Sequence, residues 1–144
     1  MTDRVPPEVR SRMMASVHGK NTSPERAVRS VLFAAGFRYR LHRRDLPGSP
    51  DILLPRYRTA VFVHGCFWHG HHCARGARPS SNVEFWNRKL DGNIARDRRN
   101  EEALFHAGWD VVILWECSLA IGCKRLLQRL NFHRRRGRHL ARAS

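Results

Sequence analysis

The sequence predicts a single α/β domain with its elements in the order helix, three strands, helix, strand, helix. The chain has 144 residues, which is enough for one hydrophobic core and short for two. Hydrophobic residues make up 42% and charged residues 27%, a balance typical of globular rather than disordered proteins. Segments with helical periodicity alternate with short apolar segments that are typical of strands.

The first helix is predicted from its start signal and its apolar stripe. Ser23 is the expected N-cap, Pro24 suits the first helical position, and Glu25 favours the positive end of the helix dipole. Gly36 ends the helix. The buried face is a stripe at helical spacing, made of Val28, Val31, Leu32 and Ala35.

Four segments have the pattern of strands. Residues 37–41 alternate between apolar residues and Arg, which indicates a half-buried strand. A Pro-Gly-Ser-Pro turn precedes the second strand at 51–54. Residues 60–64 are apolar up to the final His64, so this third strand is predicted to be central in the sheet. The fourth strand is predicted at 109–115.

Two further helices are predicted in the second half of the chain. Residues 84–107 are helical, in two pieces broken near Gly92, with Gly108 as the C-cap. A terminal helix is predicted to start with residues 124–132, and an Arg-rich tail follows it.

Composition divides the chain into three parts. An N-terminal arm at 1–22 is polar and contains one short helix at 8–17. The main domain follows at 23–132, and a basic tail occupies 133–144. No apolar run approaches the roughly 20 residues of a membrane span, and the N-terminus lacks the pattern of a secretory signal. We therefore expect no membrane association and a cytoplasmic location.

The charge of the chain indicates a polyanionic partner, of which nucleic acid is the commonest. The formal net charge is +15, and 24 of the 27 basic residues are Arg, the side chain that forks onto phosphates and stacks on bases. The segment 124–144 holds eight basic residues and no acidic one. A basic surface that merely keeps the protein soluble is the alternative.

A metal site is predicted around residues 66–73. Cys66, His71 and Cys73 lie within eight residues, and zinc takes four thiolate and imidazole ligands in structural sites. Cys117, directly after the fourth strand, and Cys123 are both candidates for the fourth ligand. The alternative is an incidental His cluster with buried free thiols.

A reaction centre is predicted near Asp51, which leads a strand after a tight turn. A carboxylate in this position can hold Mg²⁺ against a phosphate. His64 and His69 flank the adjacent loop, and imidazole can activate water or protonate a leaving oxygen. The alternatives are a strand-capping Asp51, a core His64 and a spare zinc ligand at His69.

Several motifs in order give the chain a family resemblance. The string FVHGCFWHGHHC at 62–73 is preceded by LPGSPD, which ends at Asp51, and by SRMMASVHGKNTSPE at 11–25. It is followed by EFW at 84–86, by NxxRDR from Asn93, and by WEC at 115–117. This pattern, over about residues 10 to 120, resembles the very short patch repair endonucleases.

The resemblance implies a restriction-endonuclease-like α/β fold, with a mixed central sheet flanked by helices and a structural zinc site. It implies an endonuclease domain at 23–132 that makes a Mg²⁺-dependent nick on the 5′ side of the thymine in a T:G mismatch, the product of 5-methylcytosine deamination. Double-stranded DNA with that mismatch is then the partner of a monomeric, bacterial, nucleoid-associated enzyme.

The resemblance also implies roles for individual residues. Asp51 binds Mg²⁺ together with the main-chain carbonyl of Val63. His69 is the general base, His64 orients water or phosphate, and Glu25 is an accessory acidic residue. The implied structural zinc ligands are Cys66, His71, Cys73 and Cys117. The implied DNA contacts are an aromatic wedge and a base-reading pair, made of Phe67, Trp68, Trp86, Lys89 and Asn93.

One departure and two alternatives stand beside this interpretation. The acid-x-Lys element of the wider nuclease superfamily is absent from Val61-Phe62-Val63, as expected for a family in which histidines replace it. A non-catalytic, zinc-stabilised nucleic-acid-binding module would not need Asp51, His64 and His69. A sequence-specific restriction endonuclease of the same fold would cut both strands of fully paired DNA.

Overall fold

The computed structural model describes residues 22–143, with side chains described through residue 137. Its helices and strands are α2 (Ser23–Ala34), β1 (Arg40–Leu41), β2 (Ile52–Leu54), β3 (Thr59–His64), α3 (Val83–His106), β4 (Asp110–Trp115) and α4 (Leu119–Ala143). Three short 3₁₀ turns lie at Pro55–Tyr57, Ala74–Gly76 and Glu116–Ser118. The order of elements is confirmed, while the predicted helix at 8–17 lies outside the described residues.

The sheet is mixed, with the strands in the order β1-β2-β3-β4. β2 pairs antiparallel with β1 and β3, and β3 pairs parallel with β4. β3 is buried along its whole length and has a partner on each side, as the prediction of a central strand required. The parallel register places His64 beside Trp115, so the residues that follow β3 and β4 emerge at the same end of the sheet.

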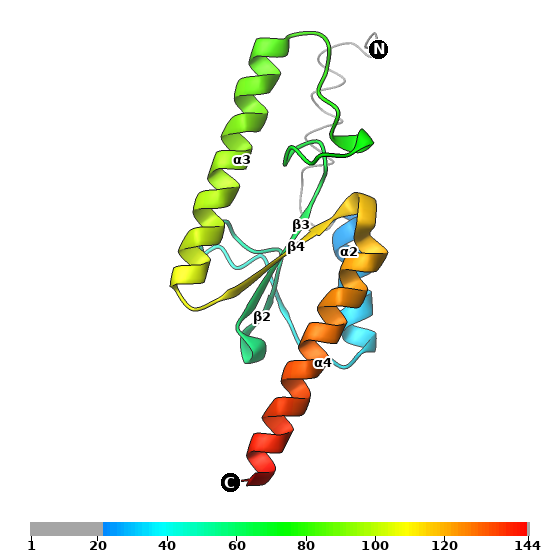
Figure 1. Ribbon diagram of the computed structural model, residues 1–144, viewed down its shortest axis with the longest axis vertical. Helices are drawn as coiled ribbons and strands as arrows, with labels where there is room; N and C mark the ends of the chain where they lie inside the picture. Colours follow the sequence, from blue (N-terminus) through cyan, green and yellow to red (C-terminus); the bar gives the residue numbers. More distant parts are fainter. Residues whose placement is uncertain (1–21, 144) are drawn as a thin grey trace.

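Helices cover both faces of the sheet. Figure 1 shows α3 on one side and α2 with α4 on the other. The larger core packs the apolar faces of α2 and α4 on the sheet, with Leu32, Val61 and Leu130 among its fully buried members. The smaller core packs Leu104 of α3 against Phe62 and its neighbours. The fold is therefore a mixed α/β layer structure, as predicted.

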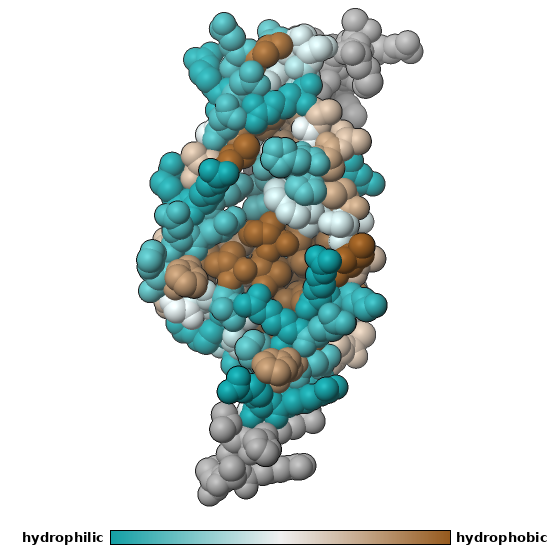
Figure 2. Space-filling model, viewed as in Figure 1, coloured by the Kyte–Doolittle hydropathy of each residue, from teal (hydrophilic) through white to brown (hydrophobic). Residues whose placement is uncertain are grey.

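β4 forms one edge of the sheet, and this edge is visible between α3 and α4. Its residues Val111, Val112 and Ile113 are only half-buried, and Figure 2 shows apolar surface gathered between the two helices at this place. Within residues 22–143, no helix combines the length and apolar character needed to cross a membrane.

Two boundaries at the N-terminal side differ from the prediction. The N-cap of α2 is Thr22 rather than Ser23, because the Thr22 hydroxyl accepts the backbone N–H of Glu25. The predicted strand at 37–41 is reduced to Arg40–Leu41. Phe37 instead turns into the larger core, where its ring packs edge-on against Tyr57.

The predicted break in the long helix is wrong, since α3 is continuous through Gly92. A Cβ at Gly92 would meet nothing within 4 Å, so this glycine makes no demand on the packing. The next residue, Asn93, is buried and donates to the carbonyl of Trp68. This contact between α3 and the loop after β3 outweighs the weak helix propensity of a Gly-Asn pair.

The terminal helix also differs, because α4 begins at Leu119 and continues through the predicted tail to Ala143. Arg134 explains part of this continuation. Its guanidinium lies 4.2 Å from the centre of the Phe37 ring and donates to the carbonyl of Ala35, so this turn of α4 is fixed to the end of α2. Arginine is moreover a good helix former.

The basic end of α4 should add sequence-independent DNA affinity. Arg135 and Arg136 are exposed, and a deletion of residues 135–144 spares the structural contact of Arg134. We expect this deletion to flatten the plot of log affinity against log salt, by about 0.9 in slope for each phosphate that is no longer neutralised. Preference for one duplex over another should persist, because phosphates carry no sequence information. An unchanged salt slope in fluorescence anisotropy titrations would contradict the assignment.

Candidate active site and metal centre

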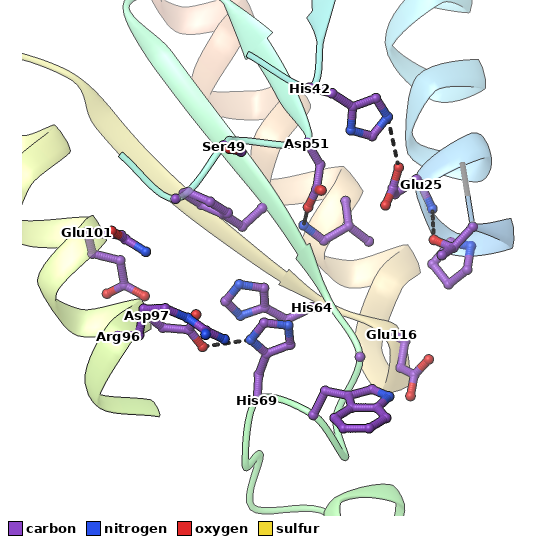
Figure 3. A pocket seen from close by; sticks show the side chains of 18 of the residues that line it. Glu25, His42, Ser49, Asp51, His64, His69, Arg96, Asp97, Glu101 and Glu116 are labelled. Carbon is purple, nitrogen blue, oxygen red and sulfur yellow. Dashed lines mark hydrogen bonds and ion pairs between the residues drawn. The ribbon is translucent and has the colours of Figure 1, made fainter. Parts of the chain in front are cut away.

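A cavity of about 760 Å³ lies where the start of α2, the start of β2, the end of β3 and the middle of α3 meet. Figure 3 shows that charged and imidazole side chains project into it from all of these elements. The predicted catalytic residues all line it, together with others that the sequence did not single out. These lining residues are Glu25, His42, Asp51, His64, His69, Asp97 and Glu116.

Asp51 stands at the inner side of this cavity, directly before β2. Its Oδ2 accepts the backbone N–H of Val63 at 2.8 Å, so the carboxylate is fixed to the end of the central strand. Burial raises the pKa of Asp51 to about 6, against the smaller lowering effect of the Val63 N–H. Because burial makes the ionised carboxylate costly, a cation beside it is favoured, since its positive charge stabilises the ionised form.

Glu25 lies beside Asp51, as the resemblance implied. It is only 4% exposed, and its Oε2 lies 3.3 Å from the Arg29 guanidinium and 3.6 Å from His42 Nε2. One ligand atom each from Glu25, His42 and Asp51 lies within 4.8 Å of the others. Three chain segments thus bring two carboxylates and an imidazole to one point.

His64 and His69 form a second cluster on the α3 side of the cavity. Their rings stack in parallel, with centroids 3.6 Å apart and planes at 2°. His69 Nδ1 lies 2.6 Å from Asp97 Oδ2. A metal ion binds in the plane of an imidazole, so two stacked rings are poorly oriented to share one ion, although their nitrogens are close. The geometry favours proton transfer instead.

Asp97 controls the orientation of His69. Burial alone raises the pKa of Asp97, but the hydrogen bond with His69 and the nearby histidines and Arg96 lower it below its ordinary value. The ionised carboxylate accepts the Nδ1 proton of His69, which leaves Nε2 as the basic nitrogen. This is the arrangement by which a carboxylate orients an imidazole base.

The predicted zinc ligands converge outside the cavity. Ligand atoms of all four lie within 4.8 Å of one another, namely those of Cys66, His71, Cys73 and Cys117. Cys117 Sγ lies 3.4 Å from His71 Nδ1, and the His71 ring stacks on Trp115 with centroids 4.1 Å apart. Cys123 instead lies in the larger core. Of the two candidates for the fourth position, the structure brings Cys117 to the cluster.

The donor set of this cluster suits zinc. Three thiols and one imidazole match the ligand types of structural zinc sites, and soft sulfur ligands disfavour Mg²⁺. The loop is also closed too tightly for a side chain at Gly76, where a Cβ would lie 2.0 Å from the carbonyl oxygen of His71. The residues present therefore fit a tetrahedral metal ion.

The three aromatic residues implied as a wedge form one cluster. Phe67, Trp68 and Trp86 are half-buried, and their rings pack edge-on with centroids 5.3 to 6.2 Å apart. Mutual packing suits a small structural cluster as well as a wedge, so the wedge stays a prediction.

The implied base-reading pair differs in exposure. Lys89 is exposed, but Asn93 is only 6% exposed. Asn93 donates to the Trp68 carbonyl and accepts from Arg96. In this conformation Asn93 therefore connects α3 to the loop after β3, and its reading of a base stays a prediction.

Three of the seven lining residues named above were not assigned roles from the sequence. Asp97 belongs to a motif that carried the resemblance, so its spacing was a usable signal. Glu116 accepts the backbone N–H of Cys66 at 3.2 Å and follows a predicted strand. His42 carried no signal, because it follows a short strand and reaches the cavity through a backbone φ of +49°.

This arrangement can hold a divalent cation next to a phosphate while an oriented histidine takes a proton from water. A chain of net charge +15 would bring a polyanion to it. The class defined by this fold and site is that of metal-dependent nucleases.

Comparison with known proteins gives the family. The family model described as DNA mismatch endonuclease Vsr matches residues 2–75. The type II nicking enzyme V.XorIIP of Xanthomonas oryzae is 53% identical over 120 residues, covering 83% of this chain and 88% of the relative. The DNA mismatch endonuclease Vsr of Escherichia coli is 41% identical over 110 residues, covering 76% and 70%. The chain belongs to the Vsr family of DNA mismatch endonucleases, and it is an endodeoxyribonuclease.

Proposed function

We propose that the protein nicks one DNA strand on the 5′ side of the thymine in T:G mismatches that arise from deamination of 5-methylcytosine. The observation that carries this proposal is the meeting of Asp51 and the His64–His69–Asp97 cluster in one cavity. The names of the relatives, nicking enzymes and a mismatch endonuclease, support a single-strand cut. The mixed sheet supports a restriction-endonuclease-like fold, and the protein acts as a monomer in the bacterial cytoplasm.

Two metals have separate tasks in this proposal. Zn²⁺, one per chain, is structural and is held by the Cys/His set outside the cavity. Mg²⁺ is catalytic and is held by Asp51 and the carbonyl of Val63, with Glu25 as an accessory acid. When bound, Mg²⁺ polarises the scissile phosphate and stabilises the charge that develops on it. Hard oxygen ligands at Asp51 suit Mg²⁺.

The side chains around this position carry the proton transfer. Asp97 holds the Nδ1 proton of His69, so His69 Nε2 accepts a proton from the attacking water. His64 stacks on His69 and restricts the ring to one plane, and it orients water or phosphate. Glu25, buried beside Asp51, adds negative charge that favours a cation there.

We expect His69→Ala to lower the single-turnover nicking rate by roughly 10²–10⁴-fold, the usual contribution of a general base. Asp97→Asn should also lower it, because an amide can no longer hold His69 in one tautomer by its charge. His106→Ala, at the exposed end of α3, is the control and should leave the rate unchanged. Wild-type rates in the first two variants would remove the pair from the mechanism.

The aromatic cluster is proposed to enter the base stack at the mismatch. Opening a base step costs a few kcal/mol and less where pairing is already weak, so an aromatic wedge favours mismatched sites. Lys89 and Asn93 follow Trp86 along α3 at helical spacing and are proposed to read base edges, with Asn93 exchanging its contact to Trp68 for one to a base.

Trp68→Ala should weaken T:G duplex binding by about ten-fold to a hundred-fold, as stacking is worth about 1–3 kcal/mol per base. Zinc content should be retained. A 2-aminopurine beside the mismatch should brighten with the wild type and with the control Phe105→Ala, but not with Trp68→Ala. Equal brightening with all three proteins would make the cluster purely structural.

The deciding experiment incubates the protein and Mg²⁺ with a T:G heteroduplex labelled on each strand in turn. The proposal requires a nick in the thymine strand alone and none in the T:A control. Cleavage of both strands of paired DNA would favour the restriction endonuclease alternative. Binding without cleavage of either duplex would favour the non-catalytic module.

A further inference from the structure

His42 lies where a third ligand of the proposed catalytic ion would be needed. It comes directly after β1, while Asp51 comes directly before β2 and Glu25 lies on the first turn of α2. Each of the three offers a ligand atom within 4.8 Å of the others. Figure 3 shows the His42 ring and the carboxylates of Glu25 and Asp51 on the same side of the central strand.

The backbone holds His42 in this place. Its N–H donates to the main-chain carbonyl of Asp51 at 3.2 Å, so the two residues are fixed to each other across the β1–β2 pair. Its φ is +49°, a left-handed conformation that only a few per cent of residues other than Gly adopt, with Asn, Asp and His the most frequent among them. Such a conformation persists only where its surroundings determine it.

The orientation of the His42 ring follows from Arg29. The Arg29 guanidinium lies 3.2 Å from His42 Nε2 and 3.3 Å from Glu25 Oε2. A guanidinium can only donate, so Nε2 accepts and its lone pair points at the Arg29 guanidinium, on the side where Glu25 Oε2 lies 3.6 Å away. The position between His42 and Glu25 therefore already accommodates the positive charge of Arg29. A metal ion bound there would displace the Arg29 guanidinium and supply the positive charge in its place.

We propose that His42 is a nitrogen ligand of the divalent ion at Asp51, with Glu25 as a further ligand, and that the site consequently prefers Mn²⁺ to Mg²⁺. This inference rests on the proposed function of Asp51 as the metal-binding residue. Mg²⁺ selects sites made of oxygen and retains several waters. An imidazole ligand shifts preference toward transition metals, and Mn²⁺ also accepts the two carboxylates.

The test measures Mn²⁺ binding to the full-length, zinc-loaded protein without DNA. Zinc loading keeps Mn²⁺ from His71. Free Mn²⁺ is counted by electron paramagnetic resonance, and electron spin echo modulation detects a ¹⁴N nucleus bound to the ion. We expect one Mn²⁺ with nitrogen modulation in the wild type. His42→Gln should lose the modulation and bind Mn²⁺ at least roughly ten-fold more weakly, the lower end of the loss from disturbed metal surroundings.

Two more variants keep the test interpretable. His42→Asn tolerates the positive φ better than glutamine does and also lacks the imidazole, so it should fold and give the same result. His106→Gln is the matched control on an exposed histidine and should bind Mn²⁺ as the wild type does. Mg²⁺ should displace Mn²⁺ more easily from either His42 variant than from the wild type, so that a smaller excess of Mg²⁺ is needed.

The outcomes separate this inference from the proposed function. Unchanged nitrogen modulation in both His42 variants would overturn the inference, even if the wild type nicks T:G DNA. Mn²⁺ binding that survives Asp51→Asn would also overturn it, because the ion would then lie elsewhere. Loss of modulation in the His42 variants with no nicking by the wild type would support the ligand set and refute the proposed function.

Discussion

Asp51→Asn should abolish nicking of a T:G duplex while the protein still binds zinc and DNA. Asparagine can still accept the N–H of Val63, so the end of β3 stays in place. The variant lacks the negative charge that is proposed to hold the catalytic cation, and among the described metal-binding groups Glu25 is the other carboxylate at this position. Single-turnover assays with excess protein measure this loss without interference from binding.

The same substitution has a predicted effect on stability, with a sign that depends on pH. The pKa of Asp51 is raised to about 6 in the folded protein, whereas an unfolded Asp titrates near 3.9. Above pH 6 the folded state is therefore destabilised by an ionised buried carboxylate that the unfolded state ionises freely. Without divalent metal, Asp51→Asn should raise the Tm at pH 7–8 and lose this advantage progressively as the pH falls from about 6 to about 4.

These two results identify a catalytic rather than a structural carboxylate. A variant that is at least as stable as the wild type and still inactive cannot owe its inactivity to misfolding. Nicking at the wild-type rate by Asp51→Asn would remove this residue from the mechanism, and a fall in Tm at neutral pH would contradict the account of its burial.

Cys117→Ala should cost the protein its zinc and much of its stability. A structural Zn²⁺ contributes on the order of 10 kcal/mol of folding free energy, which is comparable to the whole stability of a domain. Cys117 is exposed, so removal of its sulfur alone leaves no cavity. Any large effect must therefore come from the metal. Metal analysis by plasma emission and thermal melts measure the two consequences together.

Cys123→Ala is the matched control, because its sulfur lies buried in the larger core. Removal of this sulfur should cost about 1 kcal/mol in apolar packing and leave zinc bound. The opposite pattern, with zinc absent from Cys123→Ala and kept by Cys117→Ala, would show that the ligand assignment is wrong.

The sequence predicted the parts of the fold that depend on local pattern. The apolar run at 60–64 identified β3 as the central strand, and the start signal near Pro24 placed α2 within one residue. Residue types and spacing alone leave the zinc set with two candidates for its fourth ligand, of which the family resemblance implied Cys117. The choice between them depends on the parallel register of β3 and β4, which brings the residues after both strands together and leaves Cys123 on the core side of α4.

The rest depended on contacts between distant segments. Asp97 is 28 positions from His69, and the expected break near Gly92 concealed that it shares one helix with Trp86. His42 reaches the cavity through a left-handed backbone conformation that is uncommon even for histidine, so the local pattern did not reveal it. Arg134 packing on Phe37 explains part of the continuation of α4 beyond residue 132, where composition alone predicted a basic tail.

In the proposed function, the unbroken helix α3 would connect recognition of the lesion with the chemistry. Its first turns carry Trp86, its middle meets the loop after β3 through Asn93, and one turn later Asp97 holds His69. Since a helix transmits displacement along its axis, a shift of the aromatic cluster on contact with a distorted duplex would move Asp97, and with it the imidazole of His69 that is proposed to take a proton from the attacking water. Substitutions between the loop and α3 should thus alter affinity and turnover together, and an undamaged duplex would leave the catalytic histidine out of alignment.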